Sequence, residues 1–264
     1  MIKVEHLVKT FGEIEAVRDI SFDVAQGEIF AFLGPNGAGK TTTIKMLTTL
    51  LRPTSGKLEI DGLDPVTQQH EVRKRFGIVF QDSSTDDELT AFENLDLHGA
   101  LYHVAKRTRR ERADMLLKLF ELWDRRNDPV KQFSGGMKRR LEIARSLLHT
   151  PKIIFLDEPT LGLDPQTRNQ LWTHVKHLNE TERVTVFLTT HYMEEADRVA
   201  QRIAVIDHGR IVAQGTSAEL KLQTNCETLE QAFLALTGST IREESANAGA
   251  DQMRNMARMF RRPR

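Results

Sequence analysis

The sequence predicts an α/β fold with a mixed, mostly parallel sheet core, an antiparallel β subdomain and a helical insert subdomain. Three observations support this prediction. Short apolar runs recur with helical stretches between them, as in buried parallel strands. Other segments alternate apolar and polar residues, as in an antiparallel sheet with one solvated face. From about residue 90 to residue 148 no strand pattern appears, and apolar residues recur at helical spacing.

The individual elements follow from these patterns. We expect parallel strands at residues 28–33, 76–80, 152–157, 184–190 and 202–207. The alternating segments are residues 4–11, 16–24 and 56–62. The insert should hold three or four helices, with one apolar face made of Met115, Leu116, Leu119, Phe120 and Trp123. The charged run at 106–114 is interpreted as the solvated face of the insert, with a partner surface as the alternative.

Composition narrows the classes of function. The chain of 264 residues carries 37 Lys and Arg against 37 Asp and Glu, a balance that gives no global attraction to nucleic acid or anionic lipid. We therefore expect no nucleic-acid partner. The apolar runs are far shorter than the roughly 20 residues needed to span a bilayer. Cys226 is the only cysteine, which excludes an intramolecular disulfide and fits a reducing cytosol.

The stretch "GPNGAGKTT" at 34–42 matches the pattern G-x-x-x-x-G-K-[ST] between an apolar strand and a helical segment. This is the context of a phosphate-binding P-loop, in which backbone N–H groups converge on phosphate oxygens at a helix N-terminus. Lys40 should reach the β- and γ-phosphates, and the Thr41 hydroxyl should ligate magnesium. The alternative is a glycine-rich turn that contains Lys-Thr by chance. The candidate ATP-binding residues are Gly34, Pro35, Asn36, Gly37, Ala38, Gly39, Lys40, Thr41 and Thr42.

The run "IIFLD" supplies the second half expected of a P-loop nucleoside triphosphatase. Asp157 would emerge at the C-terminal end of a buried strand, beside Thr41, and hold magnesium directly or through water. Glu158 follows at once. A second carboxylate beside the metal and the γ-phosphate is placed to act as general base toward the attacking water. The alternative for this acidic pair is an exposed strand end.

The ordered set of motifs resembles the ATP-binding cassette (ABC) family over residues 2–222. The motifs are "GPNGAGKTT", Gln81 after "FGIVF", "FSGGM", "IIFLDEP", "LGLD" and His191 after "VFLTT". Two further segments, "GGMKRRLEIARSLL" and "ETLEQAFLALTG", are similar to the daunorubicin-resistance-like branch of exporters, whose membrane subunits are encoded separately. The resemblance implies ATP hydrolysis coupled to transport, by a nucleotide-binding domain at residues 2–236 with its helical insert at 90–148.

The resemblance also implies a pairing of cassettes. In this family two nucleotide domains associate head to tail, and the serine-glycine-glycine loop of each closes over the γ-phosphate held by the P-loop of the other. Ser134, Gly135 and Gly136 would then bind the nucleotide of a second cassette, taken as a copy of this chain. The alternative for "SGG" is an ordinary helix-capping turn. Met137 stands where the family often has glutamine, so any hydrogen bond from that side chain is lost. Three residues are expected to face solvent or a neighbouring domain: Lys138, Arg139 and Arg140.

The resemblance assigns the remaining roles one residue at a time. Gln81 is expected to contact magnesium and water and to link the sheet to the insert. His191 is expected to bond the γ-phosphate as a catalytic switch residue. Asp164 in "LGLD" is expected to report across the dimer interface. Phe11 lies where the family places an aromatic ring against adenine, with a core residue at the strand end as the alternative.

The leading functional prediction is an ATPase subunit that drives export of drugs or other lipophilic compounds. It would act at the cytoplasmic face of the cell membrane, with ATP and Mg²⁺, on a separately encoded transmembrane permease. The alternatives are a soluble cassette ATPase acting on DNA, ribosomes or iron-sulfur assembly, and a catalytically silent regulatory cassette. The helical insert and the loop after Gln81 should contact the membrane subunit. Residues 237–264 are interpreted as a linker and a basic tail, in which 251–264 either form an amphipathic helix on a membrane or partner or are dispensable.

Overall fold

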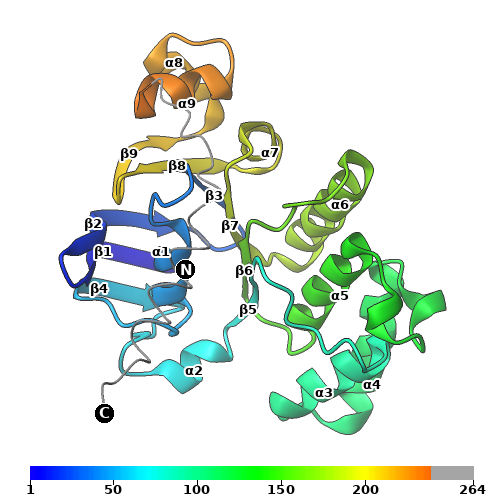
Figure 1. Ribbon diagram of the computed structural model, residues 1–264. Coiled ribbons are helices and arrows are strands. Elements are labelled where there is room, and N and C mark those ends of the chain that lie inside the picture. Colours follow the sequence, from blue (N-terminus) through cyan, green and yellow to red (C-terminus); the bar gives the residue numbers. More distant parts are fainter. Residues whose placement is uncertain (239–264) are drawn as a thin grey trace, which may run out of the picture.

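A six-stranded sheet forms the centre of the molecule, seen edge-on in Figure 1. The computed structural model describes residues 1–238. The strand order in this sheet is β5-β6-β7-β3-β8-β9, and all neighbours are parallel except β8 and β9. The strands are β3 (Ile29–Leu33), β5 (Phe76–Val79), β6 (Ile153–Asp157), β7 (Thr185–Thr190), β8 (Arg202–Asp207) and β9 (Arg210–Gly215). The predicted parallel sheet core is confirmed.

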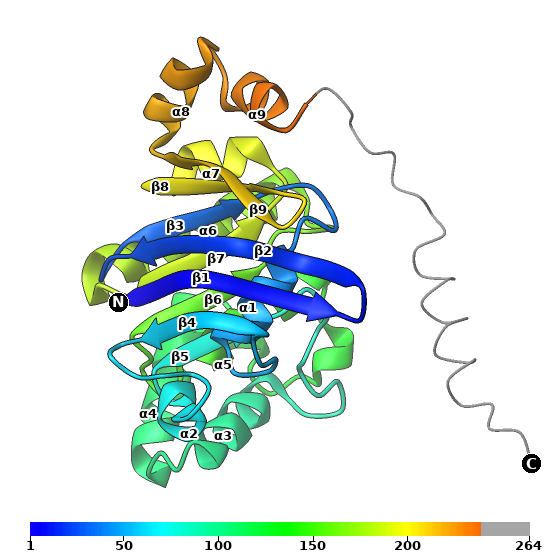
Figure 2. The ribbon, with the colours of Figure 1, turned by 90° about the vertical axis from the view of Figure 1, so that its left-hand side faces the viewer.

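The antiparallel β subdomain is also confirmed. It is a three-stranded sheet of order β2-β1-β4, with both pairs antiparallel. Its strands are β1 (Ile2–Phe11), β2 (Ile14–Val24) and β4 (Ser55–Ile60). Figure 2 shows this small sheet in front of the central one, and helix α1 (Lys40–Leu47) lies near both.

The core consists of two apolar clusters on opposite faces of the central sheet. Strand side chains alternate between the faces, so Phe30 joins the cluster toward the small sheet and Ala31 joins the cluster toward the helices. On the first face the rings of Phe22 and Phe30 stack with centroids 5.6 Å apart, and the ring of Phe187 lies 5.6 Å from that of Phe30. The central strands are therefore buried on both faces, which explains their unbroken apolar runs.

The helical insert follows β5. Its elements are α3 (Ala91–Leu101), α4 (Lys106–Leu119), two 3₁₀ turns (Trp123–Arg125 and Val130–Gln132) and α5 (Gly135–Leu147). The buried residues of α4 include Ala113, Leu116 and Leu117, at the spacing of one helix face. Met115 falls outside this stripe and is 57% exposed, so its predicted place on the apolar face is wrong.

The remaining helices cover the sheet and its last hairpin. They are α2 (Gln69–Arg73), α6 (Pro165–Glu182), α7 (Met193–Val199), α8 (Ser217–Thr224) and α9 (Leu229–Thr237). Figure 1 shows α5 and α6 on the side of the central sheet away from the small sheet, with α8 and α9 beyond β9. None of the helices within residues 1–238 combines the length and the apolar character needed to cross a bilayer. The predicted tail at 251–264 lies outside the described residues.

Candidate active site

The P-loop connects β3 to α1, and its glycines are required by close backbone approach. A Cβ on Gly34 would lie 2.4 Å from the carbonyl oxygen of Ile206, and one on Gly39 would lie 2.7 Å from that of Ala16. Gly39 also has φ +109°, a conformation that favours glycine. Gly37 has φ +77° and open space where a Cβ would be, so a ligand can approach its backbone closely. The alternative of a chance glycine-rich turn does not explain this construction.

A cavity of about 250 Å³ opens over the loop. Side chains from several distant segments line it. Its lining residues are Ala16, Pro35, Asn36, Gly37, Gly39, Lys40, Thr41, Thr42, Gln81, Glu158, Leu161 and His191. Gly34 and Ala38 belong to the same loop but are buried, and they do not line the cavity formed by residues 1–238. The cavity therefore brings together the P-loop, Gln81, Glu158 and His191, as predicted from motifs that lie far apart in the sequence.

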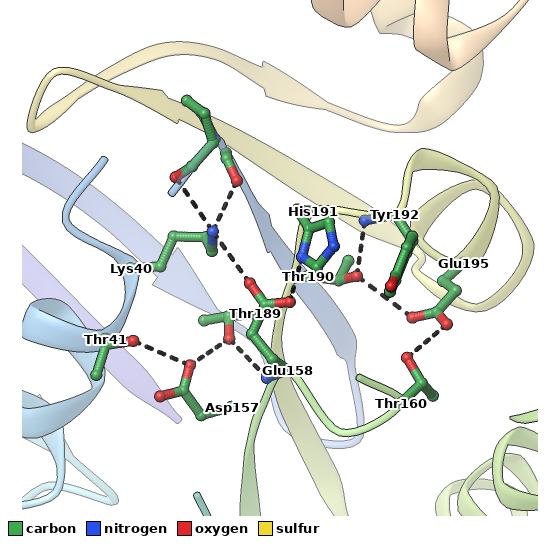
Figure 3. A network of polar contacts seen from close by, with 12 residues as sticks. Lys40, Thr41, Asp157, Glu158, Thr160, Thr189, Thr190, His191, Tyr192 and Glu195 are labelled. Carbon is green, nitrogen blue, oxygen red and sulfur yellow. Dashed lines mark hydrogen bonds and ion pairs between the residues drawn. The ribbon is translucent and has the colours of Figure 1, made fainter. Parts of the chain in front are cut away.

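Glu158 lies between two basic side chains at the centre of this cavity (Figure 3). Its Oε1 is 3.1 Å from Lys40 Nζ, and its Oε2 is 2.5 Å from His191 Nδ1. Lys40 also donates a hydrogen bond of 2.7 Å to the carbonyl oxygen of Gly34. The side chain of Glu158 is only 7% exposed. Burial by itself would raise the pKa of Glu158, but the hydrogen bond with His191 and the charge of Lys40 outweigh burial and hold this pKa below its usual range. Glu158 is therefore ionised at neutral pH.

Asp157 lies beside Thr41 at the end of β6. The Thr41 hydroxyl donates to Asp157 Oδ1 over 3.3 Å, and the Thr189 hydroxyl donates to the same oxygen over 2.6 Å. Thr189 Oγ1 also accepts a hydrogen bond of 3.1 Å from the Glu158 N–H. Thr189 thus fixes both carboxylate residues, a role the sequence analysis missed. The only sequence signal was its position near the end of the apolar strand that precedes His191.

Another buried carboxylate, that of Glu195, fixes the segment that carries His191. Glu195 is 3% exposed and accepts hydrogen bonds from the hydroxyls of Thr160 (2.5 Å) and Thr190 (3.3 Å), as Figure 3 shows. Arg168 Nε lies 3.2 Å from Glu195 Oε1. Burial raises the pKa of Glu195, and the hydrogen bonds and the charge of Arg168 oppose this only in part. The loop after Glu158 is thereby tied to the residue before His191.

The serine-glycine-glycine stretch begins α5, away from the P-loop cavity of the same chain. Ser134 is the N-cap residue, and its hydroxyl accepts a hydrogen bond of 3.3 Å from the Met137 N–H. Ser134 and Gly135 are exposed, and open space surrounds the position of a Cβ on Gly135. Within residues 1–238, neither Ser134, Gly135 nor Gly136 is among the residues that line the P-loop cavity. The chain therefore presents a free helix N-terminus in addition to the P-loop.

Asp164 is the N-cap residue of α6, and it supports the serine-glycine-glycine stretch through Thr167. Its carboxylate accepts hydrogen bonds from the N–H of Gln166 and Thr167, each 3.0 Å, and from the Thr167 hydroxyl at 2.6 Å. These hydrogen bonds hold the pKa of Asp164 below its usual range, and the bond from the Thr167 hydroxyl has the largest effect. A Cβ on Gly136 would lie 2.4 Å from Thr167 Cγ2, so the starts of α5 and α6 touch. Asp164 is not among the described residues that line the P-loop cavity.

The structure decides between the alternatives that were predicted for Phe11 and for Arg139. Phe11 ends β1 and is 48% exposed, with Lys9 Nζ 5.0 Å from the centroid of its ring, so the core-residue alternative for Phe11 is wrong. Phe11 does not line the cavity formed by residues 1–238. Arg139 is only 7% exposed, so its predicted exposure to solvent is wrong. Its side chain donates hydrogen bonds to residues outside the insert, at Asp157 and Pro159, which agrees with the alternative of contact with a neighbouring domain. Lys138 and Arg140 form ion pairs within the insert and its preceding loop, with Asp87 and Glu121.

The fold and the cavity define a P-loop nucleotide-binding protein. The sequence matches the family described as "ABC transporter" over residues 17–161. It is 44% identical, over 91% of this chain and 79% of the relative, to the daunorubicin resistance ATP-binding protein DrrA3 of Streptomyces coeruleorubidus. The chain belongs to the ABC transporter family and is an ATP-hydrolysing cassette. The predicted resemblance to the drug-resistance branch is confirmed.

Solved structures agree with this assignment. An ATP-binding subunit of an ABC transporter matches with a TM-score of 0.81 and 28% identity, covering 89% of this chain and 99% of that one. A dimeric ATP-binding cassette in a post-hydrolysis state, bound to ADP and phosphate, matches with a TM-score of 0.73 and 32% identity, covering 82% of this chain and 98% of that one. The alternative of a soluble cassette ATPase uncoupled from transport is not favoured by these relatives.

Proposed function

We propose that the chain is the ATPase subunit of an exporter of drugs or other lipophilic compounds. It works as a head-to-tail pair of cassettes on a separately encoded membrane subunit, at the cytoplasmic face of the membrane. The observation that carries the catalytic part is the buried, ionised carboxylate of Glu158 between Lys40 and His191 in the nucleotide cavity. The relative named for daunorubicin resistance supports the choice of cargo class.

Glu158 is the general base in this proposal. Its carboxylate accepts the proton of the attacking water as the water oxygen bonds to the γ-phosphorus and the bond to the bridging oxygen breaks. His191 holds Glu158 Oε2 and lines the same cavity, where it would bond the γ-phosphate in this proposal. Lys40 neutralises phosphate charge, and the backbone N–H groups of the P-loop bind the β-phosphate. Phe11, exposed at the end of β1, is available to stack on adenine.

The oxygen atoms near Asp157 suit a magnesium ion. The Thr41 hydroxyl and the Asp157 carboxylate are 3.3 Å apart, and Gln81 lines the same cavity. Hydroxyl, carboxylate and amide oxygens are the hard ligands that Mg²⁺ takes beside nucleotide phosphates. A bound magnesium ion would supply positive charge next to the phosphates.

The second cassette completes the site. Ser134 offers a hydroxyl, and the exposed start of α5 leaves helix N-terminal N–H groups that can bind the γ-phosphate held by a partner. Asp164, at the start of α6 and close to Gly136 through Thr167, lies where it can report that contact. A pair of identical chains would contain two such composite sites.

The exposed leucines of α3 are the best candidates for contact with the membrane subunit. Asp87 and Glu88, in the loop after Gln81, already form ion pairs of 2.7 Å with Lys138 and Lys131, so reversing their charge would change contacts within the chain as well as any contact with a partner. Leu97 and Leu101 are 51% and 69% exposed on the same insert. An apolar loop of a membrane subunit can cover them.

Co-purification tests this proposal. The tagged chain, expressed in its native cells and purified from solubilised membranes, should bring a polytopic membrane protein with it. The Leu97→Asp/Leu101→Asp variant should lose that protein, whereas Leu222→Asp, at a site 82% exposed on α8, should retain it. Cells that lack the chain should also become more susceptible to lipophilic drugs. Recovery of the chain without any membrane protein, together with unchanged drug susceptibility, would overturn the proposed function.

A further inference from the structure

Arg139 is a buried cation whose hydrogen bonds go mainly to backbone carbonyl oxygens of the catalytic segment. Its Nη2 donates to the carbonyls of Asp157 (3.0 Å) and Glu158 (3.2 Å), and its Nε donates to that of Pro159 (2.8 Å). Its Nη1 donates to the carbonyl of Phe80, directly before Gln81. One guanidinium from the helical insert therefore joins the segments that carry the general base and the predicted magnesium contact.

We infer that Arg139 is a positioning residue that sets the geometry of Glu158 and couples it to the start of α5. The inference rests on the proposed role of Glu158 as general base. Arg139 is not among the described residues that line the cavity, and it acts through the backbone carbonyls of Asp157 and Glu158.

The backbone of Glu158 needs such support. Glu158 has φ +50°, in the left-handed region that residues with a side chain seldom adopt. A conformation of this kind persists only where the surroundings over-determine it. Arg139 binds the carbonyl oxygens of both Asp157 and Glu158, and Thr189 binds the N–H between them. The planar guanidinium matches these oxygens with donors in a fixed fork, which an ammonium group does not offer.

A buried partner compensates the charge of Arg139 and extends the connection. Glu142, 3% exposed, lies 3.0 Å from Arg139 Nη1 and accepts a hydrogen bond of 2.8 Å from the Ser84 N–H. Arg145 donates to the carbonyl oxygen of Ser84 over 2.6 Å. The segment after Gln81 is thus fastened to α5, so the two are expected to move as one body.

The same helix begins at Ser134, the residue proposed to bind the phosphate of a second cassette. Five residues of helix rise about 7.5 Å, so Arg139 lies just over one turn from that contact. A shift of α5 as Ser134 engages the partner's nucleotide would move Arg139 with it. Through Arg139, the shift would reach the carbonyls beside Glu158 of the same chain. The chain's own hydrolysis would thereby become sensitive to occupancy of the partner's site.

Arg139→Lys tests the inference in the purified full-length chain. It keeps the positive charge beside Glu142 and removes the fork. Misplacement of a catalytic group by about 1 Å can lower kcat about 10²-fold, and we expect a loss of up to that order. The KM for ATP should stay within about threefold of the parent value, because an interaction used only in the transition state is lost.

Arg140→Lys is the matched control. Arg140 is the next residue of the same helix, and its bonds stay within the insert, to the carbonyl of Phe120 and to Glu121, both 3.1 Å. Its kcat should remain close to that of the parent. Equal kcat values for the two variants would overturn the inference. So would a fall in kcat of Arg139→Lys matched by an equal loss of ATP binding, because that pattern marks a purely structural role.

A double-mutant comparison separates this inference from the proposed function. Because Arg139 acts through Glu158, adding Arg139→Lys to Glu158→Gln should lower the residual rate little further. If the fold-loss in kcat of the double variant equals the product of the two single fold-losses, Arg139 acts independently of Glu158, and the inference is overturned. Arg139→Lys is unsuitable if it lowers the melting temperature by more than about 5 °C. In that case the double variant Arg139→Gln/Glu142→Gln takes its place in the same comparison, because it removes both charges and leaves none buried without a partner. The proposed role of Glu158 fails only if Glu158→Gln itself stays active.

Discussion

Glu158 is positioned from every side by groups that come from different parts of the chain. Lys40 and His191 contact its carboxylate, Thr189 binds its N–H, and Arg139 binds its carbonyl oxygen. The two basic side chains favour the ionised form against the effect of burial. A base with a lowered pKa is a weaker proton acceptor, but it is fully available at neutral pH.

Glu158→Gln should remove hydrolysis and keep nucleotide binding. Glutamine has nearly the same shape but accepts no proton, so kcat should fall by roughly 10²- to 10⁴-fold. ATP affinity should change little because Lys40 and the P-loop amides remain. Release of phosphate and binding of a fluorescent ATP analogue would measure the two effects. Glu180→Gln, on the exposed face of α6, is the control. A Glu158→Gln chain that hydrolyses ATP within a few-fold of the parent would exclude Glu158 as the base.

Motifs predicted the side chains that we propose to be catalytic, but not the residues that hold them. Lys40, Thr41 and Glu158 belong to short patterns whose spacing alone indicates phosphate chemistry. Arg139, Thr167 and Thr189 work through contacts with distant segments, such as that between Arg139 and Asp157, and only folding creates these contacts. The sequence also could not decide the environment of Arg139, because a buried arginine needs carbonyl partners that no local pattern predicts.

At the scale of elements, two partly buried histidines meet where α3 lies near the end of α5: His98 on α3, and His149, two residues after α5. Burial lowers the pKa of His98 to about 3 and that of His149 to about 4. The ring of Tyr102 stacks on that of His149 with centroids 3.9 Å apart. His98 Nε2 is buried without a hydrogen-bond partner among the described residues. Protonation of either ring would place a charge in this contact, so both are neutral in the folded chain.

This contact should weaken in acid. Below pH 6.5 the unfolded chain protonates His98 while the folded chain does not, so stability is complete above this pH and falls as the pH decreases toward 3. At pH 5 the loss from His98 should be about 2 kcal/mol, at about 1.4 kcal/mol for each pH unit. His98→Leu should remove that part of the loss. Urea unfolding at pH 7 and pH 5 measures it, with His177→Leu as an exposed control. An undiminished loss in His98→Leu would place the acid sensitivity elsewhere.

At the scale of the whole molecule, the chain carries two different half-sites, the P-loop cavity and the start of α5, and each would be completed by a second chain. The P-loop cavity is lined by the groups proposed to bind and hydrolyse ATP, and the exposed start of α5 does not line this cavity in the part of the chain that the structure describes. A solved relative with the same fold is a dimer bound to ADP and phosphate. Two chains arranged head to tail would join each half to its complement. ATP, with its γ-phosphate, would then bridge the chains more firmly than ADP.

Nucleotide-driven pairing is therefore expected of the isolated chain, and Gly135 offers a way to block it selectively. In the Glu158→Gln chain, which retains ATP, light scattering should show a dimer with ATP and Mg²⁺ and a monomer with ADP. Open space surrounds the Cβ position of Gly135, so Gly135→Glu should fold normally. Its carboxylate would face the partner's γ-phosphate, and like charges repel, so this variant should bind ATP as a monomer. Leu222→Glu carries the same charge on α8 and should still pair. A dimer that survives Gly135→Glu would show that the chains meet through another surface.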